Sequence, residues 1–314
     1  MKSLEKNGSI INLYSLPDMP HGRVEVFHVV PKNIQYSNTT FYCQPFNYRG
    51  LKESGLLVRD LNALAEGTKS STVGVHYAGE RSNSTRFAEG FSKEVKVTEL
   101  QVAKAADIIL AKKLLEAEKQ IDTSSQTEYI GFSAGGPIAQ LAALQDESQS
   151  KIVGLFNASC LDGRGAFRTT GRVLLHRGEA LVRGPVDKRK DRIKYGEPED
   201  TESLLEEKSR SRRDRLHRSF AESVALMRGQ THALIDSFPG TQYVIGNSYR
   251  DRIYPKNSLK KFLNARYFGE NVSFVDLEWE DHVLGPNPSK RKDRLIFIGQ
   301  KVKEARREGV IKNA

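Results

Sequence analysis

Cysteine is scarce in this chain of 314 residues, which contains only Cys43 and Cys160. Two cysteines cannot build the disulfide framework typical of small secreted proteins, so the pair fits a reducing compartment. Long apolar runs are also missing: none approaches the roughly 20 residues of a membrane-spanning helix, and the segment from Met1 to Glu5 lacks the apolar core of a signal peptide. These features predict a cytoplasmic protein with no membrane span.

Acidic residues are outnumbered by basic ones, 39 to 49, which gives a net charge of +10. The surplus is uneven, because residues 164–228 contain 17 Lys or Arg against 11 Asp or Glu. Such a stretch can attract nucleic acid, an anionic membrane or an acidic substrate, or it can form a solvated helical surface with ion pairs. The chain has no zinc-ligand spacing and no aromatic-rich RNA-binding pattern, and basic clusters such as Lys188–Lys190 are short and flanked by acids. This speaks against nucleic acid as a partner.

Strand-like and helix-like segments alternate along most of the chain. Strands are expected at residues 23–30, 39–46, 72–77, 127–130, 151–158, 242–247 and 272–279. Helices are expected at residues 54–65, 99–118, 137–144, 258–267 and 292–306. In the helix over 99–118 we expect Val102, Ala106, Ile109 and Leu110 to face the core. The alternation predicts an α/β fold with a mostly parallel sheet covered by helices on both faces, and ligands bound at the carboxyl ends of the strands.

The alternation stops between residues 163 and 237, where several helical stretches but no clean strand occur. This segment is too long for an ordinary loop. We therefore expect a core formed by residues 1–162 and 238–314, and a basic helical cap or lid inserted as residues 163–237.

A five-residue pattern, Gly131-Phe132-Ser133-Ala134-Gly135, stands between an expected strand and an expected helix. G-x-S-x-G is typical of a nucleophile elbow, a sharp strand-to-helix turn where glycines relieve clashes around an exposed serine. By chance the pattern would occur in about one chain in ten of this length, and an ordinary Gly/Ser turn is the alternative. Pro137 suits the first turn of a helix, where its missing N–H breaks no bond. The context favours the elbow.

A serine nucleophile needs a histidine base and an acid that orients the histidine. His282 lies in a loop between the last expected strand and the final helix, and His76, at a strand end, is its competitor. Asp251 follows the preceding strand, while Asp162 is an alternative acid. The order Ser133, Asp251, His282 is the chain order of elbow hydrolases.

Three segments together resemble the α/β-hydrolase fold superfamily. GFSAGG resembles the family's elbow, GNSYRDRIYP its acid loop after the seventh strand, and WEDHVLGP its histidine loop after the eighth. VHYAGERS (residues 75–82) resembles the loop after the fourth strand, with His76 where an aspartate is common. The resemblance covers nearly all of the chain except the cap, which sits where the family has its lid, and the extreme N-terminus.

The resemblance also implies an oxyanion hole, formed by the backbone N–H of Ala134 and of a residue after the third strand. That segment, residues 44–47, departs from the family's usual His-Gly dipeptide. Phe46 is the first choice for the second donor and Asn47 the alternative, because Pro45 has no N–H.

These parts predict a serine hydrolase of the carboxylic-ester or thioester type (EC 3.1), with a small-molecule acyl substrate and no metal or organic cofactor. Amide and carbon–carbon bond cleavage stay open, and the sequence does not indicate the oligomeric state. We expect substrate contacts from His76, Phe132, Arg164 and Arg168, and the basic edge of the cap suggests an anionic acyl group. The alternative is a catalytically silent protein of this fold that docks an acidic partner through its basic cap.

Overall fold

The structure is a computed structural model, and its description covers most of the expected core. The described residues are 1–6, 8–16, 24–32, 38–45, 53–77, 100–122, 124–148, 150–159, 193–194, 240–248, 251, 253, 271–279, 284 and 288–312. None of the helices in these segments combines the length and the apolar character needed to cross a bilayer. The predicted cap lies outside the described residues except for 193–194.

Nine strands of the described segments form one sheet. They are β1 (Lys2–Lys6), β2 (Ser9–Leu16), β3 (Val24–Pro31), β4 (Thr39–Cys43), β5 (Ser71–His76), β6 (Thr127–Phe132), β7 (Lys151–Phe156), β8 (Thr241–Ser248) and β9 (Val272–Leu277). Their order across the sheet is β1-β2-β3-β5-β4-β6-β7-β8-β9. The first three strands and β5 pair antiparallel, and every pairing from β5 across to β9 is parallel. The carboxyl ends of β4 to β9 therefore meet at one edge, as the sequence predicts.

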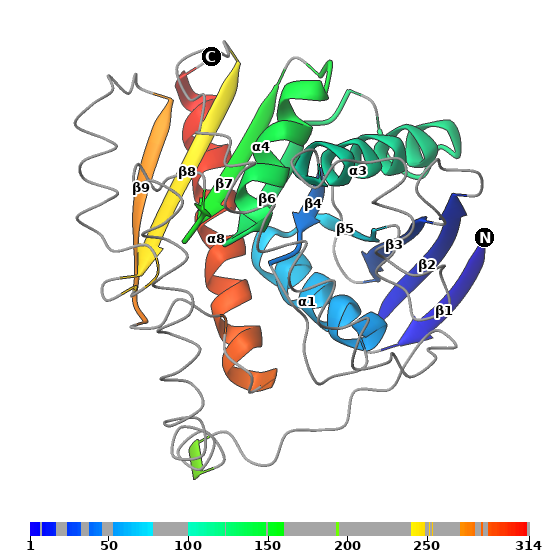
Figure 1. The fold of residues 1–314 in the computed structure, drawn as a ribbon, viewed down its shortest axis with the longest axis horizontal. Helices are drawn as coiled ribbons and strands as arrows, with labels where there is room; N and C mark the ends of the chain where they lie inside the picture. Colours follow the sequence, from blue (N-terminus) through cyan, green and yellow to red (C-terminus); the bar gives the residue numbers. More distant parts are fainter. Residues whose placement is uncertain are drawn as a thin grey trace.

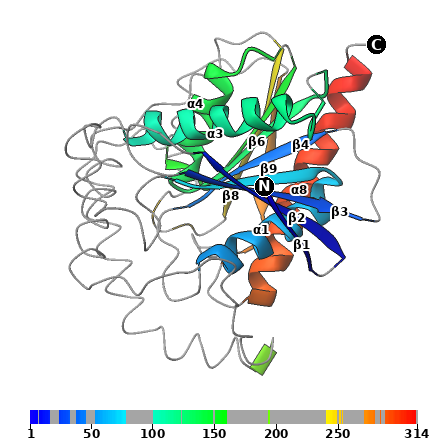
Figure 2. The same cartoon turned by 90° about the vertical axis from the view of Figure 1, so that its right-hand side faces the viewer.

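In the described part of the chain, four long helices cover the two faces of this sheet (Figures 1 and 2). They are α1 (Glu53–Thr68), α3 (Leu100–Ala117), α4 (Gly135–Gln145) and α8 (Pro288–Lys312). Figure 2 shows α3 and α4 together on one side of the strands, and α1 and α8 on the other. The expected fold class, a mostly parallel sheet with helices on both faces, is confirmed.

The core is split into two clusters by the sheet, because neighbouring residues of a strand point to opposite faces. Tyr129 packs into the cluster beneath α3 and α4, whereas Ile130 packs into the cluster beneath α1 and α8. All five residues of β4 and all six of β6 are buried. Both strands are rich in β-branched and aromatic residues, which favour strands, and this made them recognisable in the sequence.

The N-terminal hairpin of β1 and β2 was not among the predicted strands. Lys6 pairs with Ser9, so the turn consists of two residues, and Gly8 has a φ of 73°. Asn-Gly between two strands is a strong hairpin signal, because both residues tolerate positive φ. The hairpin adds β1 ahead of the strands expected from the family resemblance, so the elbow follows the sixth strand of this sheet.

The orientation predicted for α3 was wrong for Val102, which is 47% exposed, and right for Ile109, which is buried. Ala106 and Leu110 are only partly buried, while Ala105 and Ile108 are fully buried. Apolar residues occur all round this helix, so their spacing did not single out one face. The buried face also takes in Lys104, whose ammonium lies 4.8 Å from the centre of the Tyr77 ring.

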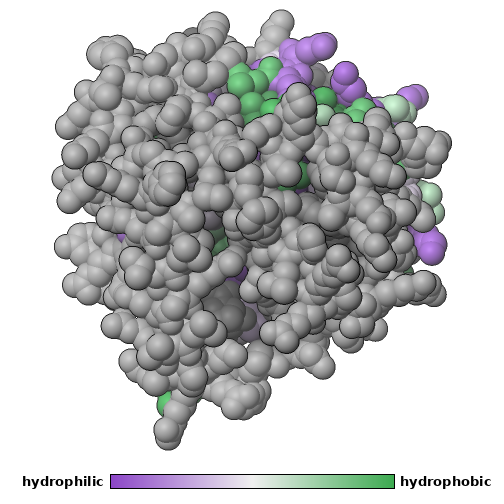
Figure 3. Space-filling view, in the orientation of Figure 1, coloured by the Kyte–Doolittle hydropathy of each residue, from purple (hydrophilic) through white to green (hydrophobic). Residues whose placement is uncertain are grey.

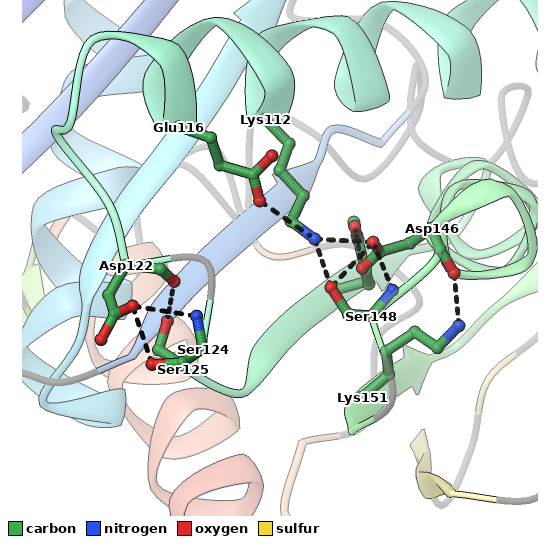
Figure 4. Close-up of polar contacts among 9 residues, drawn as sticks. Lys112, Glu116, Asp122, Ser124, Ser125, Asp146, Ser148 and Lys151 are labelled. Atoms are coloured by element: carbon green, nitrogen blue, oxygen red, sulfur yellow. Dashed lines mark hydrogen bonds and ion pairs between the residues drawn. The ribbon is translucent and has the colours of Figure 1, made fainter.

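A polar cluster joins α3 to the end of α4 at the edge of the sheet opposite the elbow (Figure 4). Lys112 donates to Asp146 over 2.6 Å, and the Tyr129 hydroxyl donates to the other carboxylate oxygen over 2.9 Å. Burial favours the protonated form of Asp146, but hydrogen bonds from Lys112 and Ser148 outweigh it and lower the pKa of this carboxyl. The carboxylate is therefore held charged between two helices of one layer.

A second buried ion pair ties α8 to the sheet. Glu128 of β6 is fully buried and pairs with Arg306, which donates over 2.7 Å from Nε. Thr40 donates to the second carboxylate oxygen over 2.5 Å, and Arg306 also donates to the Thr68 carbonyl over 3.0 Å. Burial raises the pKa of Glu128, and the guanidinium of Arg306 opposes that rise.

Exposed apolar side chains are few in the described part of the chain. On the face in Figure 3, the described surface is confined mainly to the upper and right-hand rim, where hydrophilic and hydrophobic residues are interspersed. Large exposed apolar residues include Leu4 and Ile10 of the hairpin and Phe274 of β9. Scattered residues of this kind are normal on a protein surface.

Candidate active site

Ser133 occupies the turn between β6 and α4, and its φ of 54° lies in the left-handed region. A non-glycine residue there costs about 1 to 3 kcal/mol and persists only where its surroundings enforce it. The peptide groups of Ser133 are held on both sides. Its N–H donates to the Phe156 carbonyl over 3.0 Å, and its own carbonyl accepts from Gly136 over 3.1 Å and from Ser159 over 3.0 Å.

Glycine is required on both sides of Ser133 by close backbone contacts. A β-carbon on Gly131 would lie 2.3 Å from the Gly135 carbonyl oxygen, and one on Gly135 would lie 2.0 Å from the Cys43 carbonyl oxygen. Neither neighbour is a flexible side chain that could turn away. The steric reason for the G-x-S-x-G spacing is thereby confirmed for these two positions.

The chain leaving β4 passes directly beside the elbow. Cys43 pairs with Gly131, and its buried thiol has a pKa raised by that burial. The buried Gln44 side chain donates from Nε2 to the Val75 carbonyl over 2.7 Å, which fixes the start of the segment after β4. Ala134, the N-cap residue of α4, is 9% exposed. The predicted second oxyanion donors, Phe46 and Asn47, lie outside the described residues.

Asp251 follows β8 at the same edge of the sheet and is 2% exposed. Its N–H donates to the Ser248 carbonyl over 3.2 Å, and its Oδ1 accepts from the Ile253 N–H over 2.8 Å. An aspartate side chain that accepts a hydrogen bond from the backbone N–H two residues further on closes a compact turn. The structure thus places the predicted acid, buried, two strands from the elbow strand.

His282 lies outside the described residues, but Trp279 and Leu284, on either side of it in the sequence, are described. Trp279, two residues after β9, stacks against Arg294 at 5.0 Å and meets the Phe297 ring edge-on at 5.9 Å. Leu284 is 2% exposed and belongs to the cluster beneath α8. β9 ends with Leu277 paired to Ser248, so the segment that carries His282 starts beside the acid turn.

Two other predicted site residues are buried. His76 ends β5, is 3% exposed, and meets the Phe27 ring at 5.1 Å between centres. Phe132 is 2% exposed and packs into the cluster beneath α1 and α8. Their predicted contact with substrate stays a prediction. Asp162, Arg164 and Arg168 lie outside the described residues.

Sequence reasoning missed two residues at this edge, Gln44 and Asn157. Asn157 follows β7, is fully buried and has a φ of 44°. The strand expected over residues 151–158 included Asn157, whereas β7 ends at Phe156. An asparagine close to the end of that strand was the available signal, since asparagine tolerates the left-handed conformation. In the described segments, no group of three or more His, Cys, Asp or Glu side chains is arranged to hold a metal ion.

Sequence comparison finds no matching family model and no match among curated proteins. Solved structures do match. Carboxyl esterase 2 from the mycorrhizal fungus Tuber melanosporum is 15% identical, with 97% of this chain and 89% of that one covered and a TM-score of 0.52. An α/β serine hydrolase without lid from Xanthomonas campestris is 12% identical, with coverage of 95% and 94% and a TM-score of 0.51.

An esterase from Exiguobacterium antarcticum is similar too, at 14% identity, 90% and 96% coverage and a TM-score of 0.50. At such identities the likeness concerns the fold. Together with the parallel sheet, the two helical layers and the strained serine turn, it leads to one conclusion. This chain has the α/β-hydrolase fold.

Proposed function

We propose that this protein is a serine hydrolase that cleaves an ester-like bond, a carboxylic ester or thioester, of a small molecule through an acyl-serine intermediate. The observation that carries the proposal is the positive φ of Ser133 on the turn from β6 into α4. Backbone strain of this kind concentrates at functional sites. The solved structures described as esterases agree with this function.

In the proposed reaction, Ser133 Oγ attacks the acyl carbon while His282 takes the hydroxyl proton. The tetrahedral intermediate collapses, the bond to the alcohol or thiol breaks, and His282 returns the proton to that leaving group. Water then attacks the acyl-serine, again losing a proton to His282. The carboxylic acid leaves, and the proton goes back to Ser133 Oγ.

Asp251 is the proposed orienter of His282. Asp251 lies three residues beyond Ser248, and His282 lies five residues beyond Leu277, which pairs with Ser248. An extended chain spans about 3.5 Å per residue, so both side chains can reach the elbow edge from these strand ends. Trp279 and Leu284, which stand on either side of His282 in the sequence, both pack into the core beneath α8.

The proposed oxyanion hole uses the Ala134 N–H at the start of α4 and an N–H of Phe46, or of Asn47, after β4. Each such donor lowers the barrier by about 3 kcal/mol where it meets the developing charge. The close approach of β4 to Gly135 supports this pairing of segments.

Substrate selection is assigned to the predicted cap, residues 163–237, with Arg164 and Arg168 favouring an anionic acyl group. Exposed charge pairs weaken as salt screens them. The kcat/KM for an anionic ester is therefore expected to fall more steeply with ionic strength than that for a neutral ester of equal length. If kcat/KM depends equally on ionic strength for the two esters, the proposed preference for anionic substrates is wrong, but the proposed hydrolase activity is unaffected.

The hydrolase is tested with p-nitrophenyl esters and thioesters of graded acyl length. The wild type is expected to release product, and Ser133→Ala and His282→Ala to lose about 1,000-fold or more of kcat. Ser124→Ala, an exposed serine in the Asp122 turn (Figure 4), is the matched control and is expected to keep full activity. A wild type that hydrolyses none of the panel would favour the silent docking protein.

A further inference from the structure

Asn157 lies between two residues that hold the elbow. Phe156 accepts the Ser133 N–H over 3.0 Å through its carbonyl, and Ser159 donates its N–H to the Ser133 carbonyl over 3.0 Å. Asn157 itself is fully buried, with a φ of 44°. The chain thus turns sharply at Asn157 while it holds both peptide groups of the nucleophile.

The side chain of Asn157 reaches across to β8. Its Nδ2 donates to Ser248 Oγ over 2.7 Å, and its Oδ1 accepts from the Ser248 N–H over 2.7 Å. Its backbone N–H donates to the Gly246 carbonyl over 2.8 Å. Both polar ends of the amide are therefore bound to one residue of the neighbouring strand.

These bonds continue the link between β7 and β8 beyond the last paired residues of the two strands, while β9 stays paired with β8 up to Ser248. The last paired residues of β7 and β8 are Phe156 and Gly246, yet β8 continues for two more residues to Ser248. An amide side chain carries the same donor and acceptor groups as a peptide. The Asn157 amide thus stands in for one further residue of β7 and holds the end of β8 in place.

Ser248 is the residue from which the acid turn starts. Its carbonyl accepts from the Asp251 N–H over 3.2 Å, and Asp251 Oδ1 is in turn bound by the Ile253 N–H over 2.8 Å. One continuous set of short bonds therefore runs from the Ser133 peptide through residues 156–159 to Ser248 and Asp251.

We propose that Asn157 is a positioning residue that sets the separation between the Ser133 turn and the Asp251 turn. This inference rests on the proposed hydrolase function, because it assigns to Asn157 the placement of Asp251 against His282. A misplacement of about 1 Å can cost about 100-fold in rate, so a buried link between two catalytic turns has a direct effect on kcat.

The decisive variants are Asn157→Gly and Ser248→Ala. Glycine keeps the positive φ without strain but removes both side-chain bonds, while Ser248→Ala removes only the Oγ bond and keeps the one to its N–H. The matched control is Asn62→Ala, which removes an asparagine that binds Ser9 and the Val58 carbonyl over 2.7 and 3.0 Å beside the N-terminal hairpin. All are compared in kcat, KM, the pH profile of kcat/KM and urea unfolding.

Asn157→Gly is expected to lower kcat about 10- to 100-fold with little change in KM. The kcat of Ser248→Ala is expected to lie between those of Asn157→Gly and the wild type. The acidic limb of kcat/KM reports the histidine of the free enzyme. A nearby carboxylate favours the imidazolium and raises its pKa, so a displaced Asp251 moves this limb to lower pH, by about half a unit to one unit. Asn62→Ala is expected to lower the free energy of unfolding but to leave kcat and the acidic limb unchanged.

The inference is overturned if Asn157→Gly is destabilised like Asn62→Ala yet keeps the kcat and the acidic limb of the wild type. If Asn157→Gly does not fold, Ser248→Ala decides, and an unshifted limb in that variant overturns it. A failure of the hydrolase function is distinct, because then the wild type itself neither hydrolyses the esters nor reacts with a fluorophosphonate. That result removes both proposals.

Discussion

The carbonyl oxygen of Cys43 lies only 2.0 Å from the position that a β-carbon on Gly135 would take. Cys43 ends β4, and Gly135 begins α4 directly after the serine turn. The contact therefore joins the elbow to the segment proposed to supply the second oxyanion donor. It explains why the last residue of the G-x-S-x-G pattern is a glycine in this chain.

Gly135→Ala is expected to destabilise the fold by about 3 kcal/mol, because the added methyl group meets backbone rather than a movable side chain. Urea unfolding measures the loss. Gly8→Ala is the control: Gly8 has a φ of 73° with nothing within 4 Å of its β-position, so only the conformational cost of about 1 to 2 kcal/mol applies. Equal losses in the two variants would contradict the close contact.

Gln44→Leu is expected to lower kcat more than it changes KM. Leucine leaves the Val75 carbonyl without the Gln44 donor and frees the start of the segment after β4, so the proposed oxyanion N–H is less well placed. Gln120→Leu, which removes an exposed bond of 3.3 Å to the Glu118 carbonyl, is the matched control. The assignment fails if steady-state kinetics cannot tell the two variants apart.

His28 predicts a specific pH dependence of stability. It lies in β3, is 1% exposed, and neither ring nitrogen has a hydrogen-bond partner among the described residues. Burial lowers its pKa from 6.5 to about 4. Between pH 6.5 and pH 4 the His28 ring therefore stays neutral in the folded state but takes up a proton in the unfolded chain. This difference does not affect the free energy of unfolding above pH 6.5, and it lowers that free energy by about 3 kcal/mol as the pH falls towards 4.

His28→Leu removes that proton uptake, and the difference in unfolding free energy between variant and wild type isolates it from all other groups. The difference is expected to be constant above pH 6.5 and to shift in favour of the variant by about 3 kcal/mol by pH 4. Guanidinium titrations at several pH values give these free energies. A difference that does not change with pH would show that His28 titrates normally in the folded state.

Arg306→Leu is expected to cost about 3 to 5 kcal/mol, because it leaves the fully buried Glu128 carboxylate without its countercharge. The double variant Glu128→Leu/Arg306→Leu is expected to be clearly more stable than the sum of the single losses implies. A double-mutant cycle in urea measures this coupling. Additive losses would mean that the two groups act independently of each other.

Local sequence patterns predicted those features that depend on local sterics. The serine turn was recognisable because close backbone contacts fix glycines at positions 131 and 135. The strand-helix alternation was recognisable because the buried strands are rich in β-branched and aromatic residues. The hairpin carried its signal in Asn7-Gly8, but β1 (Lys2–Lys6) is almost wholly exposed and has no apolar run.

Features that depend on residues distant in the sequence could not be predicted from local patterns. The buried face of α3 includes Gln101 and Lys104, since apolar residues encircle that helix and tertiary packing chose among them. The role proposed for Asn157 follows from the length of β8, which continues two residues beyond its last pairing with β7. That register is a property of the assembled sheet and cannot be read from the residues around position 157.

The central claim, a nucleophilic Ser133, is tested most directly by mapping the adduct of a fluorophosphonate probe with mass spectrometry. The wild type is expected to form one adduct per chain, on Ser133, more slowly in His282→Ala and not at all in Ser133→Ala. An unlabelled wild type, or an adduct that persists in Ser133→Ala, would contradict the account.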